Sequence, residues 1–268
     1  MTVRGRFIKI APMSNLTYYI GVDHREADAL KVTEGSARSF ASKPLEVRYL
    51  EHLELRRRQF FDRPWRIAED GGYWDERDGK PFSVQFSHTR FLTPLLALDE
   101  NLSGWALFTD CDWLWLDDPY KLLQEADPSK TVMVVPHNFH PENVVKMDGQ
   151  PQSRYHRKLW SALMLWNLSS KKLPTLEMIN NADGGYLHRF GWLDDSDIGY
   201  LSESWHWVPG YSPTSDGGRA AEARNKPLPI NAVHFTHGPP VPGMYERDPT
   251  PFDQMWRNEL IEAYRTRF

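Results

Sequence analysis

The amino-acid sequence predicts an α/β protein with a mixed, mainly parallel sheet flanked by helices. The chain opens as strand, helix and strand: residues 16–22 are rich in β-branched and aromatic residues, residues 27–40 carry apolar residues at helical spacing, and residues 45–50 form a second strand. A β-α-β opening favours parallel strands joined by a right-handed crossover. A further apolar run within residues 104–116 is long enough for a buried strand, and it ends in an Asp-Cys-Asp sequence.

Helical and extended patterns alternate along the rest of the chain. Residues 51–58 are predicted to be helical, whereas residues 60–81 are expected to be irregular because proline and glycine interrupt them. Residues 82–98 return to a helical pattern before the central strand. The later elements are expected as a helix at 120–125, strands at 131–136 and 159–168, a partly helical stretch at 172–190, a strand at 232–236 and a helix at 252–264, with polar loops at 139–157 and 212–229.

Composition and charge exclude several classes of protein. The chain has 268 residues, of which 40% are hydrophobic and 25% charged, ordinary values for a globular protein. A formal net charge of -4 provides no field that would gather nucleic acid, so no nucleic-acid partner is expected. Cys111 is the only cysteine, which excludes a disulfide framework. We see neither a secretory signal nor an apolar run near the ~20 residues of a transmembrane helix, and therefore expect a cytoplasmic protein.

Asp110 and Asp112 stand where the strand within residues 104–116 is expected to end. Ligands of open α/β sheets bind at the carboxyl ends of strands. In an extended chain both side chains point to the same side, and their repulsion is relieved by a proton or a cation. A hard divalent cation with oxygen ligands would satisfy both carboxylates. The alternative is that this short and common pattern caps the strand or opens a turn.

Six short segments follow one another in an order that is similar to a known enzyme family. They are His-Thr-Arg-Phe-Leu-Thr-Pro-Leu-Leu at 88–96, Phe-Thr-Asp-Cys-Asp at 108–112, Ser-Ala-Leu-Met-Leu-Trp-Asn-Leu at 161–168, Asp-Ser-Asp-Ile at 195–198, Leu-Ser-Glu-Ser-Trp-His-Trp at 201–207 and Val-His-Phe-Thr at 233–236. The chain resembles GT-A glycosyltransferases, most closely the family-eight group that includes glycogenin and the lipopolysaccharide galactosyltransferases. The resemblance implies one GT-A domain over 1–268, with a Rossmann-like nucleotide-binding part at about 16–117 and an acceptor-side part at about 118–268.

The resemblance also implies an activity and a metal. It implies a hexosyltransferase that moves a sugar from a nucleotide sugar, expected to be a UDP-sugar, to a hydroxyl of a saccharide or other acceptor, with retention. Mn²⁺ or Mg²⁺ would be held by Asp110, Asp112 and His234, and the imidazole nitrogen suits Mn²⁺ better. Such an ion neutralises the charge that develops on a departing diphosphate. The alternative for His234 is a buried strand histidine bonded to backbone.

Further residues are assigned to the donor by the same resemblance. Residues 21–23 would hold the base and ribose, Arg90 would contact the donor in a fork, and the turn after His234 would replace the family's phosphate-binding lysine, which this chain lacks. The alternatives are a turn role for Asp23 and a surface ion pair for Arg90. The complete set of candidate donor-binding residues is Gly21, Val22, Asp23, Arg90, Asp110, Cys111, His237 and Gly238.

Asp195 and Asp197 are the candidate catalytic carboxylates, because the family's Asp-x-Asp element contacts the transferred sugar. The alternative is a polar turn with capping aspartates. Ser196 stands where the family has a glutamine and Ser161 where it has an asparagine, so retention rests on the resemblance alone. The indole rings within residues 201–207 are a candidate acceptor platform, with core packing as the alternative; they belong to Trp205 and Trp207.

Two other functions remain open from the sequence. A haloacid-dehalogenase-type phosphohydrolase also places Asp-x-Asp after a strand, with one aspartate as nucleophile, although normally on the first strand. A non-catalytic nucleotide-sugar-binding protein would keep the scaffold without turnover, and the missing lysine leaves this alternative open.

Overall fold

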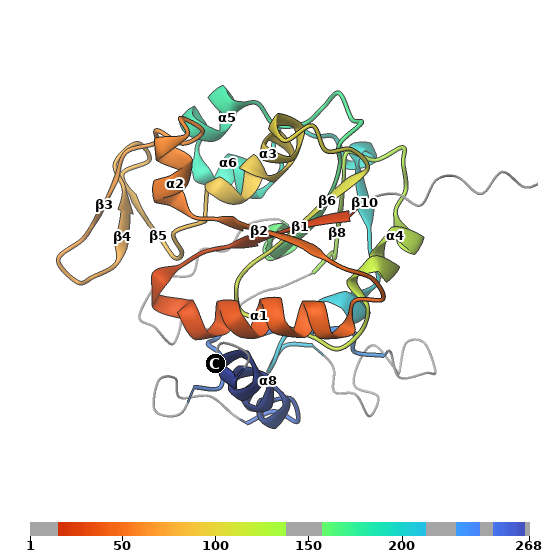
Figure 1. Cartoon of the computed structure of the whole chain (residues 1–268). Helices are drawn as coiled ribbons and strands as arrows, with labels where there is room; N and C mark the ends of the chain where they lie inside the picture. Colours follow the sequence, from red (N-terminus) through yellow and green to blue (C-terminus); the bar gives the residue numbers. More distant parts are fainter. Residues whose placement is uncertain (1–15, 138–156, 213–228, 242–248, 266–268) are drawn as a thin grey trace, which may run out of the picture.

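A six-stranded sheet forms the centre of the computed structural model, which describes residues 16–137, 157–212, 229–241 and 249–265 (Figure 1). Its strand order is β10-β8-β9-β6-β1-β2. The pairs β1–β2, β1–β6 and β8–β10 are parallel, whereas β9 runs antiparallel to both of its neighbours. The strands are β1 (Leu16–Gly21), β2 (Glu46–Leu50), β6 (Trp105–Thr109), β8 (Val132–Val134), β9 (Leu163–Asn167) and β10 (Ile198–Tyr200). The predicted mixed, mainly parallel sheet is confirmed.

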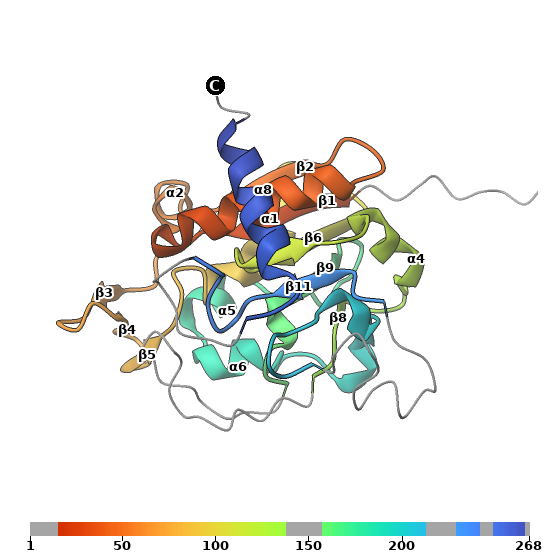
Figure 2. The same ribbon diagram turned by 90° about the horizontal axis from the view of Figure 1, so that it is seen from below.

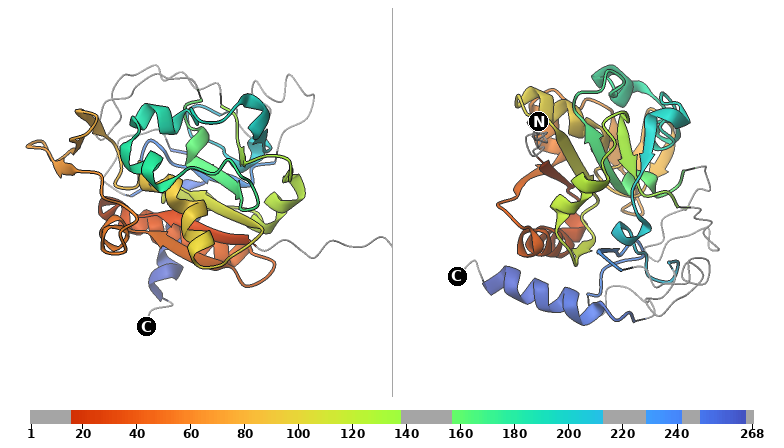
Figure 3. Two further views of the ribbon diagram at one scale, coloured as in Figure 1. Left: turned by 90° about the horizontal axis from the view of Figure 1, so that it is seen from above. Right: turned by 90° about the vertical axis from the view of Figure 1, so that its right-hand side faces the viewer.

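Helices cover both faces of this sheet. Figure 1 shows α1 and then α8 on one side and α3, α5 and α6 on the other, and Figure 3 shows the second group from above. Seen from below, α8 crosses α1 (Figure 2). Trp256 of α8 is fully buried in a cluster with Val32 of α1 and Val233. The helices are α1 (Ala27–Phe40), α2 (His52–Arg57), α3 (Thr93–Asp99), α4 (Leu122–Glu125), α5 (Leu176–Asn181), α6 (Gly184–His188) and α8 (Asp253–Arg265).

Two small sheets complete the fold. One is an antiparallel pair of β7 (Trp113–Trp115) and β11 (Ala232–His234). The other consists of β3 (Trp65–Ile67), β4 (Tyr73–Asp75) and β5 (Lys80–Phe82), and it extends from one end of the molecule in Figure 1. None of the helices in the described ranges is long and apolar enough to cross a membrane.

The predicted elements agree best with the structure where one hydrophobic periodicity continues over many residues. The helix predicted at 27–40 is α1 with the same bounds, and β1 and β2 lie within a residue of their expected ends. The prediction that residues 60–81 are irregular is wrong, since this segment contains β3 and β4 and the start of β5. These strands have three residues each and pack through the rings of Trp65, Tyr73 and Phe82. The loops predicted at 139–157 and 212–229 lie almost wholly outside the described residues.

Candidate metal and donor site at the end of strand β6

The candidate metal ligands meet because β7 pairs with β11. Strand β6 ends at Thr109, and the chain passes through Asp110 and Asp112 into β7. In the β7–β11 register Trp113 lies opposite His234, so the histidine reaches the two aspartates from a distant part of the sequence. His234 Nε2 lies 3.1 Å from Asp112 Oδ1 and 3.9 Å from Asp110 Oδ2. The structure therefore brings together the three residues that were predicted to share a metal.

Backbone and helix contacts fix the turn that carries the aspartates. The hydroxyl of Thr33, on α1, accepts a hydrogen bond from the N–H of Trp113 at 2.9 Å and donates to the carbonyl of Cys111 at 2.5 Å. The carbonyl of Asp112 accepts from the N–H of Phe235 at 2.9 Å. The turn is therefore held from α1 and from β11, and the two carboxylates project from a fixed backbone.

The three side chains fit a divalent cation. Their ligand atoms lie within 4.8 Å of one another, and the side chains of Asp110, Asp112 and His234 are only 14%, 11% and 2% exposed. Adjacent ligands on an octahedral ion with bonds of about 2.1 Å are separated by about 3 Å, close to the Asp112–His234 distance. Two carboxylate oxygens with one imidazole nitrogen form a donor set that suits Mn²⁺.

Arg90 is buried beside these ligands. Its Nη1 lies 2.9 Å from Asp110 Oδ1 and donates to the carbonyl of Ser161 at 3.0 Å. Ser161 Oγ lies 2.8 Å from Nδ1 of His188, whose pKa is held well below its ordinary value by burial and by the nearby charge of Arg90. Arg90 thus offsets one carboxylate charge and leaves the group negative, which favours a cation. The alternative of a surface ion pair is wrong, and contact of Arg90 with a donor stays a prediction.

Residues 21–23, at the end of β1, are held by packing and hydrogen bonds within the fold. A Cβ at Gly21 would lie 2.4 Å from Cγ of Phe86, so packing already requires glycine there. Val22 donates its backbone N–H to the carbonyl of Leu50. Asp23 is 1% exposed, and its carboxylate accepts hydrogen bonds from Arg25, Tyr73 and Gln85. Donor contacts of residues 21–23 remain predictions, and for Asp23 the structure shows a role in joining β1 to β4.

Three other donor candidates lie around the metal ligands. Cys111 is fully buried and its thiol donates to Glu26 at 3.0 Å, while burial raises the pKa of that thiol well above its ordinary value. His237 and Gly238 lie in the turn after β11, where Gly238 has a φ of 107°, a conformation that favours glycine. That turn closes on Phe235, whose N–H bonds to the residue preceding β7, so it adjoins the candidate ligands.

Asp195 and Asp197 lie at the opposite edge of the sheet, so the structure does not bring the predicted catalytic residues together with the candidate metal ligands. They directly precede β10, which runs in the same direction as β6, whereas Asp110 follows β6. The register of the intervening strands places Ile198 level with Ala106. Standard strand spacings then separate Asp197 from Asp110 by about 20 Å.

The local contacts of these aspartates are those of a capped polar turn. Asp197 binds Lys172 at 2.8 Å and accepts the N–H of Asp194 at 3.0 Å. Asp195 is 82% exposed and pairs with Arg157. The sequence alternative of capping aspartates is therefore the one that the structure bears out.

The two candidate acceptor tryptophans differ in exposure. Trp205 is 1% exposed and its indole N–H donates to Glu125 at 2.7 Å, so this ring serves packing rather than a platform. Trp207 is half-buried and packs against Phe252, with the ring centroids 5.2 Å apart. An acceptor contact stays a prediction for Trp207 alone.

The chain has a curated relative that covers most of its length. It is 35% identical over 246 residues to protein CDI of Arabidopsis thaliana, and the match covers 91% of this chain and 85% of that protein. The chain belongs to the protein CDI family. No family model matches it.

Solved structures identify the fold of this CDI family member. The bifunctional glycosyltransferase WbbM matches 96% of this chain with a TM-score of 0.51 and 15% identity, and this chain spans about half of it, 52%. The glycosyltransferase GlyE of Streptococcus pneumoniae matches 92% of this chain with a TM-score of 0.50 and 12% identity, over 61% of that chain. The fold is therefore of the GT-A glycosyltransferase type, while the family-eight assignment stays a prediction.

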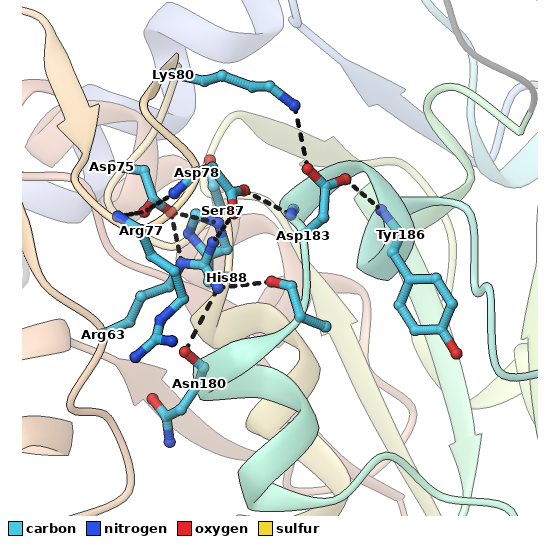
Figure 4. Close-up of polar contacts among 12 residues, drawn as sticks. Arg63, Asp75, Arg77, Asp78, Lys80, Ser87, His88, Asn180, Asp183 and Tyr186 are labelled. Carbon is cyan, nitrogen blue, oxygen red and sulfur yellow. Dashed lines mark hydrogen bonds and ion pairs between the residues drawn. The ribbon is translucent and has the colours of Figure 1, made fainter.

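A second group of two aspartates and a histidine lies between the β3–β5 sheet and α6 (Figure 4). Arg63 lies between the carboxylates of Asp75 and Asp78, with Nε 2.5 Å from the first and Nη2 2.6 Å from the second. His88 Nε2 lies 3.1 Å from Asp75, and Asp78 also accepts the N–H of Gly184 at 2.7 Å. With a guanidinium already between its carboxylates, this group does not fit a metal ion.

Sequence reasoning gave no function to His188 or His206, although both reach residues of the site. His188 contacts Ser161, and His206 Nε2 lies 2.7 Å from His234 Nδ1. Isolated histidines carry no spacing signal, and only pairing between distant segments brings these rings together.

Proposed function

We propose that this chain transfers a hexose from a UDP-sugar to a hydroxyl of a saccharide or other acceptor, in a reaction that depends on Mn²⁺ or Mg²⁺. The convergence of Asp110, Asp112 and His234 at the carboxyl end of a central strand carries the proposal. A GT-A-type fold shared with WbbM and GlyE supports it. UDP and the hexose rest on the resemblance, since no described contact reads a base or a sugar.

The residues of the chain then have separate roles. Asp110, Asp112 and His234 would hold the metal, which when bound supplies positive charge to the donor diphosphate. Arg90 keeps the Asp110 carboxylate in place through their 2.9 Å contact. The turn with His237 and Gly238 adjoins the ligands and would contact phosphate oxygens, as residues 21–23 would contact the nucleoside.

Retention is the most specific part of the proposal. In a retaining transfer the departing diphosphate takes the acceptor proton, so no carboxylate of the chain has to lie opposite the leaving group as a base. The remote place of Asp195 and Asp197 agrees with a reaction that needs neither as a base. Nuclear magnetic resonance of the product decides the point: an α-linked donor should give an α-linked product, and a β-linked product contradicts retention.

Calorimetry tests the substrate class. In Mn²⁺ we expect UDP to bind more tightly than ADP, GDP or CDP, and chelator to remove that binding together with donor hydrolysis and transfer. Asp112→Asn should lose both, whereas Asp117→Asn, which alters an exposed pair with Lys121, should keep both. Absence of UDP binding contradicts the proposal. Phosphatase activity would favour the phosphohydrolase, and binding without turnover would favour a non-catalytic binding protein.

A further inference from the structure

The ring of His206 stands directly behind the candidate metal ligand His234. Its Nε2 lies 2.7 Å from His234 Nδ1, and the two residues are each 1% exposed. His234 therefore has a neighbour on each ring nitrogen, since its Nε2 faces Asp112 at 3.1 Å.

Backbone pairing sets this contact. Trp207 donates its N–H to the carbonyl of Ala232 at 3.0 Å, and His234 donates to the carbonyl of Trp207 at 2.8 Å. The segment that carries His206 thus runs alongside β11 as a short parallel bridge. The position of the imidazole pair follows from this pairing and not from a flexible side chain.

Aromatic packing holds the two rings in their orientation. The indole of Trp113 stacks on His234, with centroids 5.0 Å apart and an interplanar angle of 9°. The ring centroids of Trp113 and His206 are 4.8 Å apart. The ring of His137 contacts that of His206 edge to face, with centroids 4.3 Å apart. In such a packed group a turn of either ring displaces its neighbours.

The 2.7 Å contact allows two arrangements of protons when both rings are neutral, because each neutral imidazole carries one ring proton. If His206 donates from Nε2, the proton of His234 must lie on its own Nε2, and no lone pair there faces the aspartates. If His234 donates from Nδ1, its Nε2 lone pair is open to a cation. Only the second arrangement makes His234 a ligand.

We propose that His206 is the positioning residue of the metal site: it accepts the Nδ1–H of His234 and so directs the His234 Nε2 lone pair toward the ion shared with Asp110 and Asp112. The inference rests on the proposed metal-dependent function. Metal-binding histidines almost always donate their second ring N–H, usually to a carboxylate, a backbone carbonyl or water, and loss of that acceptor typically lowers metal affinity 10–100-fold. Here an uncharged imidazole takes that place, so the partner adds no negative charge to the site.

Metal binding without substrate tests this role. Calorimetric titration with Mn²⁺ alone should show affinity lowered about 10–100-fold in His206→Phe, which keeps a ring but removes the acceptor. His206→Gln should restore most of the affinity, because its carbonyl oxygen lies near the position of Nε2. His52→Phe replaces a buried histidine on α2 and serves as the matched control with unchanged affinity. Equal affinity in His206→Phe and the wild type overturns the inference, as does equal loss in the Phe and Gln variants.

Nitrogen spectra of the wild-type imidazole rings test the same point when His206→Phe does not fold. With Mg²⁺ or Zn²⁺ bound, His234 should carry its proton on Nδ1, and a proton that stays on Nε2 overturns the inference. A wild-type chain that binds no divalent metal contradicts the proposed function as well, whereas normal metal binding by His206→Phe contradicts the role of His206 alone.

Discussion

Two groups in this molecule contain the same side chains, two aspartates, one histidine and one arginine, and they differ in what the carboxylates already bind. In the Asp75–Asp78–His88 group, Arg63 pairs with both carboxylates at 2.5 and 2.6 Å, and backbone N–H groups bind them as well. In the Asp110–Asp112–His234 group, Arg90 pairs with Asp110 at 2.9 Å, and the three candidate ligand atoms lie within 4.8 Å of one another.

The difference has a physical cause in the position of the arginine. A guanidinium between two carboxylates supplies the charge that a metal would otherwise supply, in fixed planar geometry. Burial raises the pKa of Asp75, but hydrogen bonds from His88 and Arg63 outweigh it and hold the pKa well below its ordinary value. Residue types and proximity alone therefore do not make a metal site. The groups that the carboxylate oxygens already bind determine whether a metal ion fits between them.

Removal of one charge from the Arg63 group should have the largest effect on stability. Asp75→Asn removes one of the two carboxylates that pair with Arg63, whose side chain is only 1% exposed, and leaves Asp78 as the remaining partner, so we expect a loss of about 1.5–3 kcal/mol in the free energy of unfolding. Urea unfolding measures it. Mn²⁺ affinity of the folded fraction should stay within about twofold, because no ligand of the other group changes. A fall in Mn²⁺ affinity with unaltered stability would reverse the roles assigned to the two groups.

A variant of the Asp110–Asp112–His234 group should lower metal affinity and leave stability nearly unchanged. Asp112→Asn removes a candidate ligand, and we expect Mn²⁺ affinity to fall at least ~10²-fold, about 2.7 kcal/mol at 1.36 kcal/mol per tenfold. Unfolding in chelator should change little, since the backbone bonds of the turn remain and one repulsive charge is lost. Calorimetry and urea unfolding of the same preparation give both values. Unchanged affinity would remove Asp112 from the metal site.

Acid should reduce the difference in unfolding free energy between the wild type and Asp75→Asn. The pKa of Asp75 is lower in the folded chain than the value near 4 of an unfolded aspartate, so its stabilisation is fully present above that value and is lost as the pH falls. We expect the gap in unfolding free energy to shrink below about pH 4, by at most about 1.4 kcal/mol per pH unit. Unfolding series from pH 6 to pH 3 measure it, and a gap that widens in acid would contradict the direction of the shift.

Sequence predicted those parts of the molecule whose signal is local. Helix α1 repeats apolar residues over 14 positions, and its bounds were predicted correctly. Asp110 and Asp112 were predicted from their place after a strand and His234 from the resemblance, and β7–β11 pairing brings the three together. Strand β10 has three residues, too few for an alternating pattern, so nothing in the sequence showed that Asp195 and Asp197 precede a strand rather than follow one. Arg63 and Asp75 lie in the segment predicted to be irregular, where contacts between distant residues fix the structure.

The smallest effect should come from the pair of Lys80 and Asp183, which lies at the outer side of the Arg63 group (Figure 4). The contact is 3.1 Å, against 2.5 and 2.6 Å for Arg63, and its side chains are 67% and 46% exposed. Water screens such a pair and ordering a lysine costs entropy, so Lys80→Met should lower the unfolding free energy by only ~0–1 kcal/mol. Lys80 is the better residue to change, because Asp183 also accepts the N–H of Tyr186 at the start of α6. If Lys80→Met destabilised the chain as much as Asp75→Asn, burial could not be what separates the two pairs, and the Arg63 group would have to be seen as one network that includes Lys80.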